Sequence, residues 1–379
     1  MVSFFAVGAT FFAVPPLVPT LRSEFDLTNL ALGLLMGAIA IPAIALSIPL
    51  GAALDRWPPR AAGLSALTVM FAGAAMFSLA PTYSWLLAGR LLFGAGALLL
   101  NLLLARVLTA AFAGRELGLA MGLFTGTYPA SMIVLFSLHP WLEAGLGWRG
   151  EMGLLAGLVL LALPLHLLAI PTRLEHRGER ELPVDGPRFS RPLVALGCAW
   201  MLYFAAFAAV PTFAPEWAGG GSAGLLITSL ITWVALFATP AAGGLIDRTG
   251  SPERWALGGL TLLAITLAAM AAGLPAAITM MSVGIVAGVL PAAVYALPAV
   301  LVSPARVGLA FGFITALSNL GTVVGPVLAG AVRDATHRWP VLWLVLSAVA
   351  VAGAMAAGQV RRPEAIPAPS QTDLHPPNA

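Results

Sequence analysis

Two long apolar runs of this sequence are separated by the stretch Gly51-Ala52-Ala53-Leu54-Asp55-Arg56-Trp57-Pro58-Pro59-Arg60. A second version, 192 residues later, reads Gly243-Gly244-Leu245-Ile246-Asp247-Arg248-Thr249-Gly250, and both copies contain G-x-x-x-D-R. A charged pair beside membrane-length helices is costly unless it lies at the membrane surface. Each copy therefore predicts a short loop between two membrane helices. Because the spacing is close to half the chain, it also predicts two similar halves.

The composition is that of a polytopic membrane protein. Hydrophobic residues make up 59% of the 379-residue chain and charged residues only 9%, whereas soluble proteins carry about 25% charged residues. The formal net charge of +3 gives nucleic-acid binding no support. The one cysteine, Cys198, excludes an internal disulfide and a cysteine-built metal site. The N-terminus lacks a basic region, so it predicts a first membrane span and not a cleaved signal peptide.

Twelve runs are long enough to cross a bilayer, which takes about 20 apolar residues in a helix. They cover residues 3–21, 29–51, 61–80, 84–107, 117–137, 150–172, 192–213, 222–243, 254–273, 276–301, 307–331 and 340–358. The fold class that follows is an all-α membrane protein with twelve transmembrane helices. We expect a six-helix bundle over 1–172, a polar cytoplasmic linker over 173–191, a second six-helix bundle over 192–358, and a proline-rich, disordered cytoplasmic tail over 359–379.

The distribution of arginine predicts the orientation. With the N-terminus inside, the cytoplasmic loops hold 14 arginines and the outer loops hold 4. Positive charge favours the cytoplasmic side, so we expect both termini in the cytoplasm. We expect a multi-pass protein of the cell inner (plasma) membrane, surrounded by lipid bilayer and monomeric.

A second internal repeat supports two related halves. The segment Gly118-Leu-Ala-Met-Gly-Leu-Phe-Thr125 in the fifth run matches Gly308-Leu-Ala-Phe-Gly-Phe-Ile-Thr315 in the eleventh, 190 residues later. Two matches at nearly one offset, in a chain of twelve spans, predict two pseudo-symmetric six-helix units related by an axis along the membrane normal.

At this point the chain resembles the major facilitator superfamily of secondary transporters over nearly its whole length. The family's loop signature, G-x-L-A-D-R-x-G-R-R/K, is similar to Gly51–Arg60, with Pro58 in place of a glycine. The fourth-span signature R-x-x-x-G-x-G is similar to Arg90-Leu-Leu-Phe-Gly94-Ala-Gly96. The fifth-span signature of proton-coupled exporters is poorly matched. The resemblance implies that spans 1, 4, 7 and 10 line a central cavity.

The two loop carboxylates, Asp55 and Asp247, are candidates for a conformational latch. A carboxylate at the membrane surface can accept hydrogen bonds from the N-terminus of a neighbouring helix. Much of the weight of this hypothesis comes from the resemblance, and the alternative is a membrane-edge anchor with no switching role. The predicted latch residues are Gly51, Asp55, Arg56, Arg60, Gly243, Asp247 and Arg248.

Arg90 lies about two turns into the fourth span, with no acidic residue nearby in the sequence. An ionised side chain there costs several kcal/mol unless it faces water or a partner. At about 100° per residue, Arg90, Gly94 and Asn101 share one helix face, which could line the cavity. The alternative is that Arg90 reaches the surface or pairs with backbone carbonyls.

The acidic residues are informative by their positions. All sixteen fall in a loop, at a helix end or in the tail, and the histidines are peripheral except His166. Proton symporters and cation exporters usually need a buried titratable group. We therefore expect a neutral or anionic substrate over a cationic one. A coupling ion, if one is used, would depend on surface acids, His166 or a co-bound ion.

Polar and aromatic residues inside the spans supply the remaining cavity candidates. For each residue the alternative is helix–helix packing. The predicted substrate cavity comprises Arg90, Asn101, Tyr128, Trp200, Tyr203, Tyr295 and Asn319.

These patterns together predict a transporter of a small solute, working by rocker-switch alternating access. The chain has no phosphate-binding G-x-x-x-x-G-K-[ST] loop and no H-E-x-x-H or clustered His/Cys site, so ATP-driven transport, an enzyme, a metal and a cofactor are all disfavoured. An efflux pump for amphiphilic or drug-like compounds is the alternative. A non-transporting receptor of the same fold is the third hypothesis.

Overall fold

The computed structural model describes residues 2–54, 56–112, 117–170, 190–302 and 306–360, and within these ranges the regular elements are helices without strands. Their order along the chain is α1 (Val2–Phe11), α2 (Val14–Phe25), α3 (Asn29–Gly37), the 3₁₀ segment η1 (Ala38–Ala40), α4 (Ile41–Leu54), α5 (Pro59–Ser78), α6 (Tyr83–Ala111), α7 (Leu117–Ala169), α8 (Arg191–Trp217), α9 (Gly221–Thr249), α10 (Pro252–Ala271), α11 (Ala276–Ala296), α12 (Pro298–Leu301), α13 (Val307–Thr336) and α14 (Trp339–Ala357).

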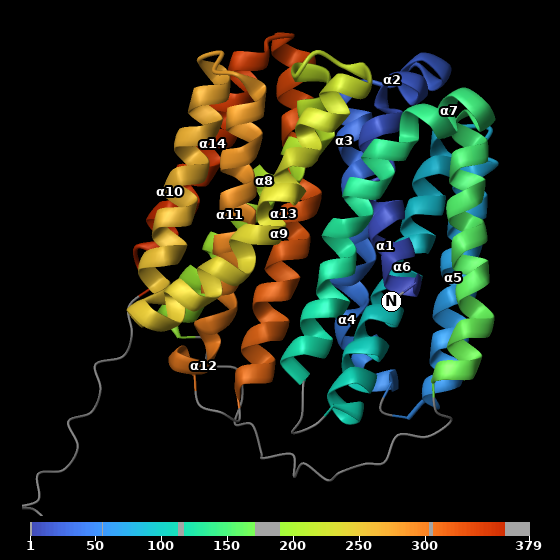
Figure 1. The fold of residues 1–379 in the computed structure, drawn as a ribbon, viewed down its shortest axis with the longest axis horizontal. Coiled ribbons are helices and arrows are strands. Elements are labelled where there is room, and N and C mark those ends of the chain that lie inside the picture. The colour runs from blue at the N-terminus through green and yellow to red at the C-terminus, as the bar shows by residue number, and fades with distance from the viewer. Residues whose placement is uncertain (1, 55, 113–116, 171–189, 303–305, 361–379) are drawn as a thin grey trace, which may run out of the picture.

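The number of membrane-length segments is compatible with the expected twelve. Ten helices of the described residues are long and apolar enough to cross a bilayer, and the pair α1–α2, bent by 44°, makes an eleventh. Helix α7 is 53 residues long, but Gly147 interrupts it at φ 65° and ψ 170°. Glycine adopts this positive φ without the steric cost of a Cβ. The chain folds back at Gly147 (Figure 1). Helix α7 therefore supplies two membrane-length segments, although it counts as one of the ten helices.

Proline starts the helix that follows each copy of the repeated loop. Pro59 opens α5 and Pro252 opens α10. Proline is favoured in the first helical turn because its missing N–H would have no partner there anyway. Pro58, which stands in place of a glycine of the family's loop signature, is the residue immediately before α5.

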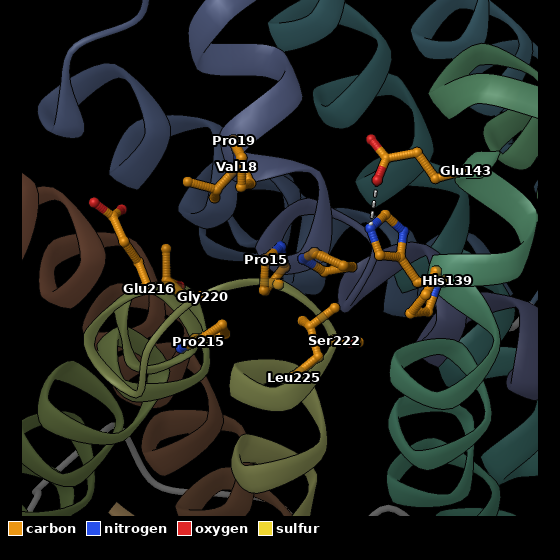
Figure 2. Close-up of a pocket in the computed structure, with 14 residues that line it drawn as sticks. Pro15, Val18, Pro19, His139, Glu143, Pro215, Glu216, Gly220, Ser222 and Leu225 are labelled. Carbon is orange, nitrogen blue, oxygen red and sulfur yellow. Dashed lines mark ion pairs between the residues drawn. The ribbon is translucent and has the colours of Figure 1, made fainter.

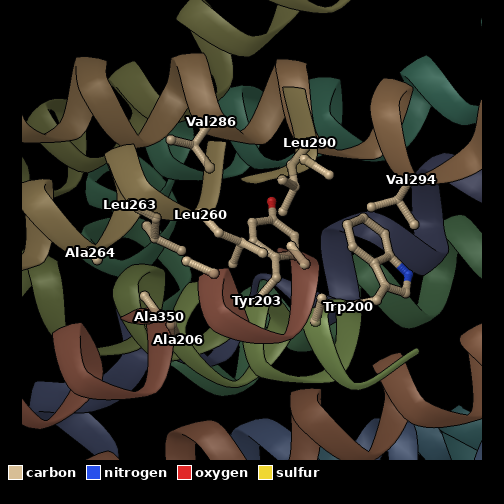
Figure 3. Packing of buried hydrophobic residues seen from close by; sticks show 14 of the residues in the cluster. Trp200, Tyr203, Ala206, Leu260, Leu263, Ala264, Val286, Leu290, Val294 and Ala350 are labelled. Carbon is tan, nitrogen blue, oxygen red and sulfur yellow. The ribbon is translucent and has the colours of Figure 1, made fainter. Parts of the chain in front are cut away.

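The apolar core is divided between two bundles. One cluster of buried side chains is built only from residues 193–360, and part of it is drawn in Figure 3. Two further clusters belong to the first half, and one of them also takes in Leu225 of α9. In Figure 1 the blue-to-green helices and the yellow-to-red helices form two neighbouring groups. The expected two-bundle, all-α architecture is confirmed.

The bundles meet along the membrane-length runs that carry the two sequence repeats. Helix α3 packs against α13, and α7 packs against α9. Within the second contact, the Thr232 hydroxyl lies 3.1 Å from the Met132 sulfur. The second and eleventh runs thus pair across the interface, as do the fifth and the eighth, which is the arrangement that two related halves produce.

Most of the expected linker and tail lie outside the described residues. Arg191, the last residue assigned to the linker, is the first residue of α8, and the Ser190 side chain caps that helix by accepting from the Leu193 amide at 3.4 Å. Gln359 and Val360, the first residues assigned to the tail, form a hydrogen-bonded turn after α14 with Val360 buried.

Candidate functional site

One end of the interface between the bundles is joined by charged and polar side chains. Arg22 of α2 donates to Glu216 of α8 at 2.9 Å and to Asn29 of α3 at 2.7 Å. The Asn29 side chain in turn donates to Asp334 of α13 at 2.7 Å. We call the end that contains Arg22, Asn29, Glu216 and Asp334 the closed end; it is the upper end in Figure 1.

Asp334 caps a helix that belongs to the other bundle. One carboxylate oxygen accepts from the backbone N–H of Asn29 at 2.9 Å and the other accepts from that of Leu30 at 2.8 Å. The N-terminus of a helix carries unpaired N–H groups and partial positive charge. The negative charge of Asp334, in the last turn of α13, therefore stabilises the partial positive charge at the N-terminus of α3.

Below this cap the two backbones are in direct contact. A Cβ added to Gly33 of α3 would lie 2.1 Å from the carbonyl oxygen of Pro326 in α13. No side chain fits in that space, so the approach of α3 to α13 depends on glycine at position 33.

The repeated loop lies at the opposite end, where the surroundings are open. A Cβ added to Gly51 or to Gly243 would meet nothing within 4 Å. Asp247 and Arg248 are exposed, and neither has an ion pair with any described residue. We call the end that holds the two copies of the loop the opposite end.

The first copy of the loop makes its described contacts inside its own bundle. Arg60 donates through Nε to the Ile170 carbonyl at 3.1 Å, and Arg56 is exposed. Asp55 lies outside the described residues. Among the latch residues that the structure describes, no hydrogen bond or ion pair joins the two bundles in this conformation.

Arg90 of α6 is buried, with 1% of its surface exposed, and its guanidinium binds backbone carbonyls at two helix breaks. It donates to Thr10 and, at 3.2 Å, to Phe11, where α1 ends. It also donates to Leu35 at 3.2 Å and to Met36 at 3.4 Å, where α3 gives way to the 3₁₀ segment.

The Pro15–Pro16 pair explains why the Phe11 carbonyl needs an outside donor. In a continuous helix the Phe11 carbonyl would accept from the N–H of residue 15, but proline has none. The Arg90 guanidinium, which always carries its charge and has several donors in a fixed plane, supplies the missing hydrogen bond. This geometry matches the alternative stated for Arg90, pairing with backbone carbonyls, and at 1% exposure the side chain is not open to a solute here.

The other residue predicted on the same face of α6, Asn101, is exposed. Ala97, one turn earlier, is buried at 7%. The face that carries Arg90 thus opens toward the half of α6 that leads to the opposite end.

Three of the predicted aromatic residues lie together in the second bundle. Trp200 and Tyr203 stack with ring centroids 5.0 Å apart, and Tyr295 of α11 meets Trp200 edge-on at 5.7 Å. Trp200 and Tyr203 are buried at 1% and 2%, whereas Tyr295 is 50% exposed. Figure 3 shows Trp200 and Tyr203 among aliphatic side chains. Tyr295 is the member of this aromatic cluster that a solute could reach.

The last two predicted cavity residues are less informative. The partly buried Asn319 donates to the Thr315 carbonyl of its own helix at 2.9 Å. The side chain of Tyr128 lies outside the described residues.

A buried ionisable pair was missed by the sequence reasoning. The Nδ1 atom of His139 lies 2.8 Å from a carboxylate oxygen of Glu151, and both side chains are buried. The expectation that every acid and every histidine but His166 is peripheral is wrong for this pair, because the fold-back at Gly147 presses the two ends of the α7 spans together. The sequence carried one indication that His139 has an acidic neighbour: Glu143 follows it by four residues, which places the two side chains on one helix face.

A pocket of about 270 Å³ lies beside this pair at the closed end, between α2, α7, α8 and α9. His139 and Glu143 line it from the first bundle, and Glu216 and Ser222 line it from the second (Figure 2). We call it the vestibule pocket.

His166, the histidine singled out from the sequence, lies apart from this pocket. Its ring packs against Gly63 of α5, where an added Cβ would lie 1.9 Å from the imidazole. It is buried at 4%, and its Nε2 atom has no hydrogen-bond partner. Among the described residues, no group of three or more His, Cys, Asp or Glu side chains could hold a metal ion.

Two helical bundles that carry repeated loops, joined at one end and open at the other, define a membrane transporter of the two-bundle class. The chain belongs to the Major Facilitator Superfamily, whose family profile matches residues 1–218 and 193–377. It is therefore a multi-pass membrane transporter and not an enzyme.

Relatives and solved structures of similar fold are transporters. The lysosomal dipeptide transporter MFSD1 of Bos taurus is 28% identical over 292 residues, which cover 69% of this chain but only 62% of that protein. The nucleoside transporter NupG superposes with a TM-score of 0.77 at 14% identity, covering 95% of this chain and 97% of NupG. A bacterial homologue of the human lysosomal transporter Spinster, in an inward-facing and occupied conformation, gives 0.73 at 15% identity, covering 94% of each chain.

Proposed function

We propose that this protein transports a small polar solute, neutral or anionic, by alternating access of one central site to the two sides of the membrane. Residues 1–172 and 192–358 act as the two units that rock against each other. The observation that carries the proposal is the contrast between the closed end, held by Asp334, Asn29, Arg22 and Glu216, and the opposite end, where the loop glycines meet nothing.

The substrate class rests on the chemistry of the residues that can reach a central space. Asn101 is exposed on α6, and Tyr295 is exposed on α11. An amide and a phenol are hydrogen-bonding groups without formal charge, which suits a neutral polar solute. MFSD1 and NupG, named for dipeptides and nucleosides, carry solutes of this polar kind.

The repeated loop has a role in the other half of the cycle. When the opposite end closes, Asp55 and Asp247 would approach helix N-termini of the facing bundle, as Asp334 now caps α3 at the closed end. A carboxylate is stabilised at such a position. The arginine distribution supports an orientation in which the opposite end, both termini and the loop face the cytoplasm, and we propose that the membrane is the plasma membrane.

Uptake into proteoliposomes of purified protein tests the substrate class. The probes are a labelled dipeptide, a nucleoside, a hexose, a small organic anion and a lipophilic cation. We expect saturable uptake of one of the polar solutes, lowered by Tyr295→Ala and unchanged by Ile265→Ala. Ile265 is 61% exposed on α10, a helix whose main contacts, with α9, α11 and α14, lie within its own bundle. Transport of the lipophilic cation alone would contradict the proposal and favour efflux of amphiphilic compounds.

A distance measurement tests alternating access. Cys198 is the only cysteine, so Cys198→Ser gives a background for spin labels at Ser23→Cys and Ala272→Cys, two exposed positions near the closed end of different bundles. We expect two populations of distances whose ratio changes when a transported solute is added. One fixed distance under all conditions would contradict a rocking motion.

A further inference from the structure

We propose that His139, Glu143 and Glu151 form a proton-binding site, open to the vestibule pocket, whose bound proton stabilises the closed end. We call these three residues the His139 cluster. The inference rests on the proposed alternating access, because it concerns the stability of one of the two conformations.

The position of the imidazole between two carboxylates favours an additional proton. His139 lies between two carboxylates: Nδ1 is 2.8 Å from Glu151, and Nε2 is 3.2 Å from Glu143. A neutral imidazole has one N–H, and an ionised carboxylate only accepts hydrogen bonds. Both contacts can be hydrogen bonds only if the cluster holds one proton more than a neutral histidine with two carboxylates. Whether that proton sits on the ring or on a carboxylate, it belongs to the cluster as a unit.

Burial makes this proton important for stability. Glu151 is 1% exposed, and its second carboxylate oxygen is buried without a hydrogen-bond partner. A buried carboxylate is costly unless a partner of opposite charge is close, and the imidazolium form of His139 is that partner.

The charged groups nearby do not replace the proton. Arg22 of α2 is paired with Glu216 of α8, which lies across the pocket. Arg149 of α7 is paired with Glu24 of α2 at 2.6 Å.

The remaining helices around the cluster present hydroxyl groups. From α2 the Thr20 hydroxyl donates to Glu143, and from α9 Ser222 lines the pocket. These hydroxyl groups carry no charge. Because Arg22 and Arg149 already have carboxylate partners, the imidazolium of His139 is the cation that faces Glu151 and Glu143 among the described residues.

The cluster is linked to the contact between the bundles. Glu143 binds the ring of His139 with one oxygen and the Thr20 hydroxyl with the other. Two residues further along α2, Arg22 makes the ion pair with Glu216 of the second bundle. Water in the vestibule pocket can deliver a proton to the ring, because His139 and Glu143 both line that pocket (Figure 2).

Loss of the proton has a defined direction of effect. The imidazole nitrogen that loses its hydrogen presents a lone pair to a carboxylate, so the attraction between that nitrogen and the carboxylate becomes a repulsion. Glu143 then holds Thr20 and α2 less firmly, and the closed end is weakened. Low pH therefore favours closure, and high pH favours opening at this end.

The test uses the Ser23–Ala272 label pair in the Cys198→Ser background between about pH 5 and about pH 8, the range in which histidine side chains usually titrate. We expect the closed population to fall as the pH rises in the parent protein, and this response to disappear in Glu151→Gln. If Glu151→Gln does not fold, Glu143→Gln takes its place, because the Glu143 side chain is already 34% exposed. His337→Asn, at an exposed histidine that follows α13, is the matched control and should keep the response.

The outcomes separate the two proposals. Gly33→Ala, which crowds Pro326, serves as the positive control for opening. If Gly33→Ala opens this end but the pH response is absent, or is the same in Glu151→Gln as in the parent, the proton site is wrong and alternating access stands. If no variant and no pH changes the distance, both proposals are wrong.

Discussion

The closed end and the opposite end of the interface are built from different kinds of contact. At the closed end, Asp334 and Glu216 of the second bundle bind groups of the first, and α3 approaches α13 at Gly33 without an intervening side chain. At the opposite end, Asp247 and Arg248 are exposed.

The difference teaches where the stability of this conformation resides. Two conformations of one transporter commonly differ by a few kcal/mol, so contacts confined to one end can decide which is populated. Substitutions at the closed end should therefore change the equilibrium, and matched substitutions at the opposite end should change it little while this conformation prevails.

The largest effect is expected for Arg90, and Arg106 near the other end of α6 is the residue with which it is compared. Arg90→Met removes the donor from the carbonyls of Phe11 and Leu35, and leaving such buried groups unpaired should destabilise the protein by about 3 kcal/mol. Arg106→Met, at a partly exposed residue that donates to Leu54, should cost less than about 1 kcal/mol. Thermal unfolding in detergent compares the two variants. Equal losses of stability in the two variants would mean that the burial of Arg90 does not increase its contribution to stability.

The next effect concerns the backbone contact between the bundles. Gly33→Ala forces a methyl group against the Pro326 carbonyl and should weaken the closed conformation by about 2 to 3 kcal/mol. Gly51→Ala, where nothing lies within 4 Å, is the matched control and should shift the equilibrium by less than about 1 kcal/mol. The Ser23–Ala272 distance reports the populations. A closed population that survives Gly33→Ala would show that α3 and α13 can separate without opening this end.

A smaller effect is expected for the helix cap. Asp334→Asn keeps an acceptor for α3 but removes the negative charge, which should weaken the closed conformation by about 1 kcal/mol. Asp247→Asn, in the repeated loop, is the counterpart at the opposite end and should have no effect on the same distance. An equal response of the two variants would remove the distinction between the ends.

The smallest effect belongs to the exposed ion pair. Arg22 and Glu216 have side chains that are 32% and 34% exposed, and such a pair contributes less than about 1 kcal/mol. Arg22→Gln should therefore shift the distance populations slightly and make them less sensitive to salt, which screens exposed charges. Arg248→Gln is the matched control. A large shift for Arg22→Gln at high salt would indicate a role beyond this ion pair.

The sequence predicted the architecture because repeats are local patterns. The Gly51 and Gly243 loops and the Gly118 and Gly308 segments predicted related membrane runs in the two halves, and the helices of those runs, α3 with α4, α7, α9 and α13, are among those through which the bundles meet. Apolar length was sufficient to predict that the chain consists of membrane-length helices, whereas the count of twelve spans stays a prediction.

The contacts of the site were harder to predict because they join residues far apart in the chain. Asn29 and Asp334 are separated by 305 positions, and nothing in either segment alone indicates the other. Asp334 was counted among the peripheral acids, although it caps α3. The same local view assigned Arg90 to a cavity, because the sequence does not show that its acceptors lie where α1 ends at Phe11 and where α3 ends at Gly37.

The Arg90 contact also has a consequence for the order in which the chain assembles. The Phe11 carbonyl receives its donor from a residue 79 positions later, and a backbone carbonyl without a donor is unfavourable in lipid. The first span therefore remains incomplete in the bilayer until the fourth has been inserted beside it. During synthesis, the early helices of the first bundle should be held near the insertion machinery as a group, and released together once Arg90 has arrived.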